Sequence, residues 1–171
     1  MASVQTRAPI TSIMNILTKI TATFCLFLIG ITQANASSTI FTKAEFEQVK
    51  QQYQDQQWLM LLWSVDCPPC FKELAIIGKL SQKSDKLNFI LINTDADEES
   101  SAERQAVIQQ FKLQNVANFH FADGQADQSR YLIDPHWYGE LPRSYFIQNN
   151  GTFNGKSGLV SESLLRQWLG I

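Results

Sequence analysis

The stretch WLMLLWSVDCPPCFKEL (residues 58–74) contains the signals that decide the fold. Residues 58–64 form a nearly continuous apolar run of strand length, which is typical of a strand buried on both faces of a sheet. Cys67 and Cys70 follow and enclose two prolines. Neither proline offers a backbone N–H, so the pair fits only the first turn of a helix. The stretch therefore predicts a buried strand leading into a helix that begins at a Cys-Pro-Pro-Cys motif.

On both sides of this stretch the apolar pattern alternates between helices and strands. Thr42 and Glu45 have the spacing of a capping box, which predicts a helix N-terminus. Residues 149–151 (Asn-Asn-Gly) predict the turn of a hairpin. This order indicates one α/β domain with a mixed central sheet covered by helices on both faces. Helices are expected at 42–53, 68–81, 125–131 and 161–170, and strands at 58–64, 88–94, 118–123, 143–148 and 152–158. The stretch 95–111 is expected to begin as an acidic loop and then become helical.

The first 36 residues have the composition of a secretory signal. Arg7 and Lys19 are followed by an apolar stretch that ends in Ala-Asn-Ala at residues 34–36, a small-x-small cleavage pattern. The uninterrupted apolar core is about a dozen residues, whereas a membrane-spanning helix needs roughly 20. We therefore expect a signal peptide at 1–36 and a single periplasmic domain at 37–171. The alternative is a domain anchored to the membrane by an uncleaved N-terminal segment.

Charge and cysteine content narrow the function of the exported domain. All 16 acidic residues lie beyond residue 36, so the domain is acidic and lacks a basic patch for nucleic acid. Cys25 lies in the predicted signal, which leaves Cys67 and Cys70 as the cysteine pair. A bridge between them closes so short a loop that a purely structural role is disfavoured. Tetrahedral zinc needs further ligands, and nothing in the sequence places both His120 and His136 beside the cysteines. No metal and no cofactor beyond the redox-active disulfide is expected.

The Cys-Pro-Pro-Cys motif favours thiol–disulfide exchange. Cys67 is expected at a helix N-terminus, where the macrodipole and free N–H groups stabilise a thiolate. After two prolines, the N–H of Cys70 is the main donor left for the Cys67 sulfur. Cys70 lies one turn into the helix, so it is predicted to be the shielded, resolving thiol. Asp66 directly precedes Cys67, and its carboxylate is expected either to raise the Cys67 pKa or to be a solvated loop acid.

The segment LLWSVDCPPCFKEL (61–74), followed by GELPRSYFIQNNG (139–151), resembles the thioredoxin-fold thiol–disulfide oxidoreductases of the TlpA/ResA/DsbE type. The resemblance covers roughly residues 40–171. It implies a thioredoxin-like fold with a TlpA-type helical insertion, which would correspond to 97–137. Trp63 would be the first aromatic residue of the family motif and part of the substrate-binding surface.

The resemblance also assigns the reacting residues. Cys67 corresponds to the nucleophile and Cys70 to the resolving cysteine. Pro142 corresponds to a cis-proline that faces the disulfide, and the backbone of Leu141 would pair with a substrate strand. The family usually has a tryptophan before the first cysteine, where this chain has Asp66.

Several further residues near the motif have two interpretations each. Trp137 either covers the active-site face or belongs to the core. His136 and Arg143 are candidate modulators of the cysteines, with an exposed loop position as the alternative. Leu61 occupies the place, six residues before the first cysteine, where many thioredoxins carry a buried acid. Glu73 is expected at the surface or near a helix cap.

The function that these residues predict is protein-disulfide reductase. The Pro-Pro dipeptide of the resembling family, together with Asp66, suggests a reductant of specific periplasmic protein disulfides, supplied with electrons by a membrane donor. The alternatives are a copper(I)-binding chaperone using Cys67, Cys70 and His136, and a redox-inactive thioredoxin-fold interaction domain.

Overall fold

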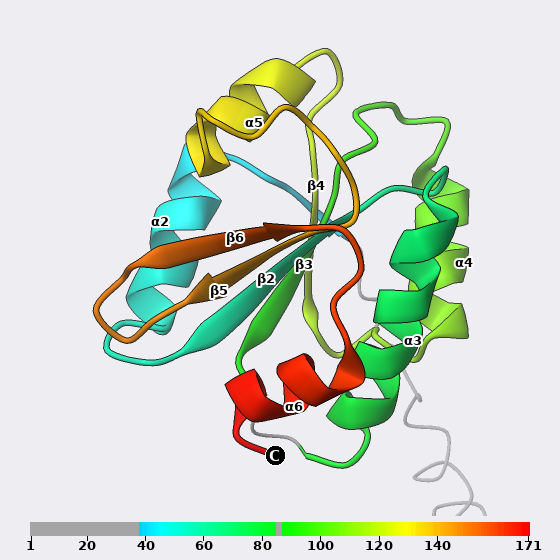
Figure 1. Cartoon of the computed structure of the whole chain (residues 1–171). Coiled ribbons are helices and arrows are strands. Elements are labelled where there is room, and N and C mark those ends of the chain that lie inside the picture. Colours follow the sequence, from blue (N-terminus) through cyan, green and yellow to red (C-terminus); the bar gives the residue numbers. More distant parts are fainter. Residues whose placement is uncertain (1–37, 85–86) are drawn as a thin grey trace, which may run out of the picture. The chain divides into compact units, whose positions relative to one another are not determined.

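A six-stranded sheet with the strand order β1-β4-β3-β2-β5-β6 forms the centre of the structure (Figure 1), a computed structural model that describes residues 38–84 and 87–171. The strands are β1 (Thr39–Ile40), β2 (Trp58–Trp63), β3 (Phe89–Asn93), β4 (Ala117–His120), β5 (Arg143–Ile147) and β6 (Phe153–Ser157). The helices are α2 (Lys43–Gln52), α3 (Pro68–Ser81), α4 (Ser101–Gln110), α5 (Ala126–Ile133) and α6 (Glu162–Leu169).

Strand β2 is the central strand on which the site is built. It pairs in parallel with β3 and antiparallel with β5, and all six of its residues are buried. Because side chains alternate along a strand, Leu59, Leu61 and Trp63 face one layer of helices, and the residues between them face the other. Burial on both faces explains why the sequence shows an unbroken apolar run here.

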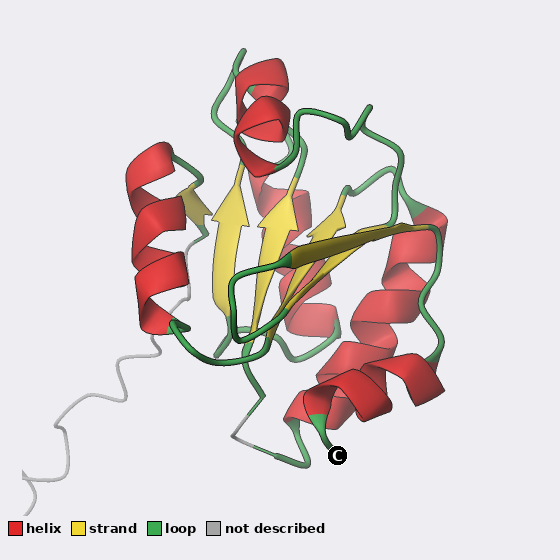
Figure 2. Ribbon diagram, turned by 60° about the vertical axis from the view of Figure 1, so that its left-hand side comes forward, coloured by secondary structure: helices red, strands yellow, loops and turns green. Residues whose placement is uncertain are grey.

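Helices cover both faces of the sheet (Figures 1 and 2). Helices α3, α4 and α6 supply apolar residues to one hydrophobic cluster, which includes both cysteines of the Cys-Pro-Pro-Cys motif. Helices α2 and α5 supply the cluster on the other face. The mixed sheet between two helical layers agrees with the fold class predicted from the sequence.

The helix and strand boundaries agree with the sequence prediction at most positions. Thr42 is the N-cap of α2 as the capping-box spacing predicted: its hydroxyl accepts a hydrogen bond from the Glu45 amide at 3.4 Å and donates to the Glu45 carboxylate. Strand β1 was not predicted, because a strand of two residues is too short to show an alternating apolar pattern in the sequence. Helix α4 begins at Ser101, after the acidic start of the stretch 95–111, because Asp97 accepts hydrogen bonds from the amide and hydroxyl of Ser100 and holds the preceding residues as a loop.

The stretch 97–137 contains the strand β4 as well as the helices α4 and α5. Strand β4 lies inside the central sheet, between β3 and β1. The stretch therefore extends the sheet and does not add helices alone. Its correspondence to a TlpA-type insertion stays a prediction.

The predicted signal peptide at 1–36, and with it the alternative of an uncleaved anchor, lies outside the described residues. Among the helices that the structure does describe, none is long and apolar enough to cross a membrane.

Candidate active site at the Cys-Pro-Pro-Cys motif

Cys67 and Cys70 form a disulfide in the structure, with their Cα atoms 5.3 Å apart. Both lie in the apolar cluster beneath α3, but they differ in access. Cys67 is 7% exposed and Cys70 only 1%. Cys67 is therefore the more exposed residue of the pair, as expected for a nucleophile with a shielded resolving partner.

Helix α3 begins in the way that the two prolines predict. Cys67 is the N-cap residue, and Pro68 and Pro69 occupy the first two helical positions. The amide of Cys70 donates to the Cys67 sulfur at 3.3 Å, so the predicted hydrogen bond is confirmed. A donor at this distance and the positive end of the helix dipole both favour a thiolate on Cys67 once the disulfide is reduced.

The loop that presents Cys67 is held by an acid from the neighbouring strand end. The Asp95 carboxylate, just beyond β3, accepts hydrogen bonds from the Val65 amide and the Asn93 side chain, both at 2.8 Å. Asp66 itself is exposed, and only its backbone is engaged, through an amide donated to the Ser64 hydroxyl at 3.0 Å. The acid with a structural role at this loop is therefore Asp95, which the sequence analysis did not single out.

The peptide bond between Leu141 and Pro142 is cis, as the family resemblance implied. Its position follows from strand register. Leu62 of β2 pairs with Arg143 of β5, so Pro142 comes next to the end of β2, from which the chain runs into the cysteine loop. Leu141 is partly buried and packs against both hydrophobic clusters, which places it at the border between the two faces of the sheet.

Glu73 is a buried acid in the helix that follows the cysteines. It is only 3% exposed and accepts a hydrogen bond from the Ser144 hydroxyl of β5 at 2.7 Å. Burial raises its pKa to about 7, although Ser144 and the charge of Lys156 act in the opposite direction. The sequence expectation of a surface or cap position is wrong. A residue three positions after Cys70 lies on the same side of the helix, so an acid that titrates near neutral pH lies one turn from the resolving cysteine.

The residue after the cis-proline faces away from the cysteines. Arg143 shares its side of β5 with Tyr145, which belongs to the cluster beneath α2 and α5, whereas Ser144 points to the cysteine side. The Arg143 guanidinium pairs with Asp134 at 3.1 Å and with Glu140 at 3.6 Å. Its charge is thus neutralised within the loop before Pro142. Its role as a modulator of the cysteines stays a prediction that this placement disfavours.

Asp134 is the centre of that loop network. Burial alone would raise its pKa, but the His136 amide, the Tyr145 hydroxyl and the charge of Arg143 together hold the pKa below its usual value. The His136 ring is almost fully exposed, with Nδ1 3.6 Å from an Asp134 oxygen. His136 is therefore an exposed loop histidine, and modulation of the cysteines by it stays a prediction. In the part of the chain that the structure describes, no group of three or more His, Cys, Asp or Glu side chains could hold a metal ion.

The aromatic residues near the site are mostly buried. Trp137 is 4% exposed, belongs to the cluster on the α2 side and donates from Nε1 to the Glu140 carbonyl at 3.0 Å, so its core interpretation is the correct one. Trp63 is 3% exposed and packs with the cysteines, and substrate contact by either tryptophan stays a prediction that this burial disfavours. Tyr138, which the sequence analysis did not select, is 90% exposed in the same loop.

Comparison with known proteins gives matches at the level of structure. No protein-family model matches the sequence, and no curated protein is significantly similar to it. A secreted Mycobacterium tuberculosis disulfide oxidoreductase homologous to E. coli DsbE superposes with a TM-score of 0.56 and 18% identity over 81% of this chain and 98% of that chain. StoA from Bacillus subtilis superposes with a TM-score of 0.51 and 20% identity over 67% of this chain and 83% of that chain. A thioredoxin-family thiol:disulfide interchange protein from Chlorobium tepidum superposes with a TM-score of 0.54 and 14% identity over 71% of this chain and 82% of that chain.

The chain has a thioredoxin-like fold. Identities of this size establish the fold alone, and the structural neighbours are thiol–disulfide oxidoreductases by their descriptions. In this thioredoxin-like domain the disulfide opens α3, the cis-proline follows the loop from α5, and Glu73 joins α3 to β5. The family resemblance found in the sequence therefore agrees with the three-dimensional similarity.

Proposed function

We propose that the protein is an exported thiol–disulfide oxidoreductase that reduces disulfides of specific periplasmic proteins. The observation that carries the proposal is the Cys67–Cys70 disulfide at the N-terminus of α3, in which Cys67 is the more exposed residue of the two. An inert staple has no need of a helix N-terminus and a buried acid one turn away.

The reaction balances as two successive exchanges. The Cys67 thiolate of the reduced protein attacks one sulfur of a substrate disulfide, and the other substrate sulfur leaves as a thiolate. Cys70 then attacks the Cys67 sulfur of the mixed disulfide, which releases the second substrate thiolate and forms the Cys67–Cys70 disulfide. Two electrons pass to the substrate, and a membrane thiol donor must return them.

Glu73 is suited to accept the proton of Cys70. A buried carboxylate with a pKa near 7 is about half deprotonated at neutral pH, so it can take up a thiol proton and return it later. Ser144 anchors the carboxyl from β5 through its hydroxyl. Many thioredoxins have a buried acid at the position that Leu61 occupies here. In this chain the buried acid is Glu73 of α3 instead.

A redox titration of the purified protein tests the direction of the reaction. CxxC proteins with this fold range from about −270 mV to about −120 mV. A potential at the low end supports a reductant, whereas a value near about −120 mV would make the protein an oxidase. Insulin-disulfide reduction should be lost in Cys67→Ser, and activity that persists in this variant belongs to a contaminant.

Trapping of mixed disulfides in cells would identify the substrate protein. Cys70→Ser should accumulate mixed disulfides through Cys67 in cells, because the resolving thiol is missing. The double variant Cys67→Ser with Cys70→Ser is the matched control and should capture nothing. Equal capture by both variants would mean that Cys67 is not the attacking thiol.

A further inference from the structure

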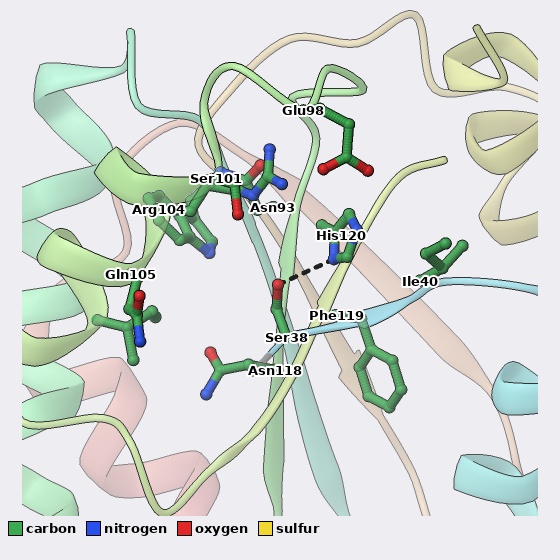
Figure 3. Close-up of a pocket in the computed structure, with 12 residues that line it drawn as sticks. Ser38, Ile40, Asn93, Glu98, Ser101, Arg104, Gln105, Asn118, Phe119 and His120 are labelled. Atoms are coloured by element: carbon green, nitrogen blue, oxygen red, sulfur yellow. Dashed lines mark hydrogen bonds between the residues drawn. The ribbon is translucent and has the colours of Figure 1, made fainter. Parts of the chain in front are cut away.

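A cavity of about 340 Å³ lies between α4, β4 and β1, away from the disulfide (Figure 3). Neither cysteine lines it, and Trp63 and Ile108 are residues that line the cavity and also belong to the cysteine cluster. A volume of this size is at the lower end of the range for small-molecule sites. Most of the residues that line the cavity are polar or charged, and the apolar ones are Ile40, Trp63, Ile108 and Phe119.

Arg104 of α4 is a buried cation in this cavity. It is 4% exposed, and none of the described carboxylates forms an ion pair with it. Hydrogen bonds from Ser100 lower the pKa of Asp97, and the charge of Arg104 lowers it further without an ion pair between the two side chains. Its Nη1 donates to the carbonyls of Asp97 at 2.8 Å and Asp95 at 3.4 Å, while Nε is buried with no partner among the described residues. Buried arginines are almost always paired, because removing an uncompensated charge from water is costly.

A second charged residue, Glu98, lines the same cavity. Figure 3 shows its carboxylate above His120, whose Nδ1 lies 2.9 Å from the Ser38 hydroxyl. Burial lowers the pKa of His120, the Arg104 charge lowers it further, and Glu98 acts in the opposite direction. His120 is therefore neutral near pH 7, and the two charged groups of the cavity are the buried Arg104 and the exposed Glu98.

We propose that this cavity binds an α-amino acid with an apolar side chain. The carboxylate of the ligand would form an ion pair with Arg104, and its ammonium would meet Glu98. The apolar residues available to contact the side chain of the ligand are Ile40, Trp63 and Ile108. Phe119 is not among them, since its ring packs against Phe41 on the other face of the sheet. The proposal does not depend on the cysteine chemistry.

Three probes separate the contributions of the two charges. L-leucine carries both groups, isocaproate is the same skeleton without the ammonium, and isoamylamine is the skeleton without the carboxylate. In calorimetric titrations of the purified protein, L-leucine should bind saturably, isocaproate about tenfold more weakly and isoamylamine more weakly still, since charge-assisted hydrogen bonds to Arg104 dominate. Absence of saturable L-leucine binding would overturn the proposal.

Two variants assign the binding to these residues. Glu98→Gln should weaken L-leucine about tenfold and leave isocaproate unchanged, because the lost partner is the one for the ammonium. Glu99→Gln, an exposed neighbour that does not line the cavity, is the matched control and should bind like the wild type.

Arg104→Gln should abolish binding of both L-leucine and isocaproate, with folding checked by circular dichroism. If this variant does not fold, the comparison of Glu98→Gln with Glu99→Gln decides alone. Equal affinity for L-leucine in wild type and Glu98→Gln would contradict the proposed orientation and with it the site.

Discussion

At the scale of single residues, the buried carboxyl of Glu73 has the clearest consequence. Its pKa is about 7 in the folded chain against an ordinary value of 4.5. Between these values the folded state holds more protons than the unfolded state, so the free energy of unfolding falls as the pH rises. Glu73→Gln removes this titration. Below pH 4.5 the two proteins should therefore have similar stability. By pH 7 the variant should be more stable, by of the order of 3 kcal/mol, since each pKa unit corresponds to about 1.4 kcal/mol.

Urea unfolding at a series of pH values measures this difference. Glu103→Gln, an exposed acid of α4, is the control and should follow the wild type. A stability gap that stays constant from pH 4.5 to 7 would show that Glu73 does not retain its proton in the folded protein. If Glu73 also accepts the Cys70 proton, Glu73→Gln should slow the resolution of mixed disulfides at neutral pH.

Asp66 should have a weak effect on the cysteine that follows it. Its side chain is exposed, and solvent and salt screen an exposed charge. Asp66→Asn should therefore lower the Cys67 pKa by no more than about half a unit, in the direction expected from removing a neighbouring negative charge. The Cys67 pKa of the wild type and of Asp66→Asn is measured from the thiolate absorbance of the reduced proteins across a pH titration. A drop of more than about one unit would mean that Asp66 acts on the sulfur directly.

At the scale of elements, the close approach of α3 to the end of α4 depends on Gly78. A Cβ at this position would overlap the carbonyl oxygen of Phe111, the C-cap residue of α4. In an exposed helix Gly→Ala usually stabilises by up to about 1 kcal/mol. Here we expect Gly78→Ala to destabilise the protein by roughly 1–3 kcal/mol, because backbone atoms must move.

Lys79→Ala is the matched control, since Lys79 is the exposed neighbour in the same helix. It should change the midpoint of denaturant unfolding by little. A Gly78→Ala protein as stable as the wild type would show that the two elements can separate at little cost.

At the scale of the whole molecule, the proposed direction of electron flow sets the relative stability of the two redox forms. A reductant readily gives up electrons, so its fold should favour the disulfide over the dithiol, whereas a strong oxidant has a stabilised reduced form. The oxidised protein should therefore unfold at a higher urea concentration than the reduced protein. Cys70→Ser should show no such dependence on reductant. A reduced form more stable than the oxidised one would contradict the reductant assignment.

The sequence by itself determined the path from β2 through the cysteines into α3. These signals are local: an apolar run of strand length, then two prolines that fit only a helix start. The same local logic predicted the hydrogen bond from Cys70 to Cys67. The cis geometry at Pro142 was implied by the family resemblance and not by its own neighbourhood.

Only the tertiary structure decided which polar residues serve the site. Glu73 on its own helix looks like a surface acid, and it is buried because Ser144 of a distant strand lies over it. Asp95 lies in an acidic run of the sequence, yet its carboxylate accepts a hydrogen bond from the Val65 amide, thirty residues earlier in the chain. Arg143 follows the cis-proline but faces the other side of the sheet. Each outcome depends on strand register and on contacts between remote segments, which the spacing of residues along the chain does not encode.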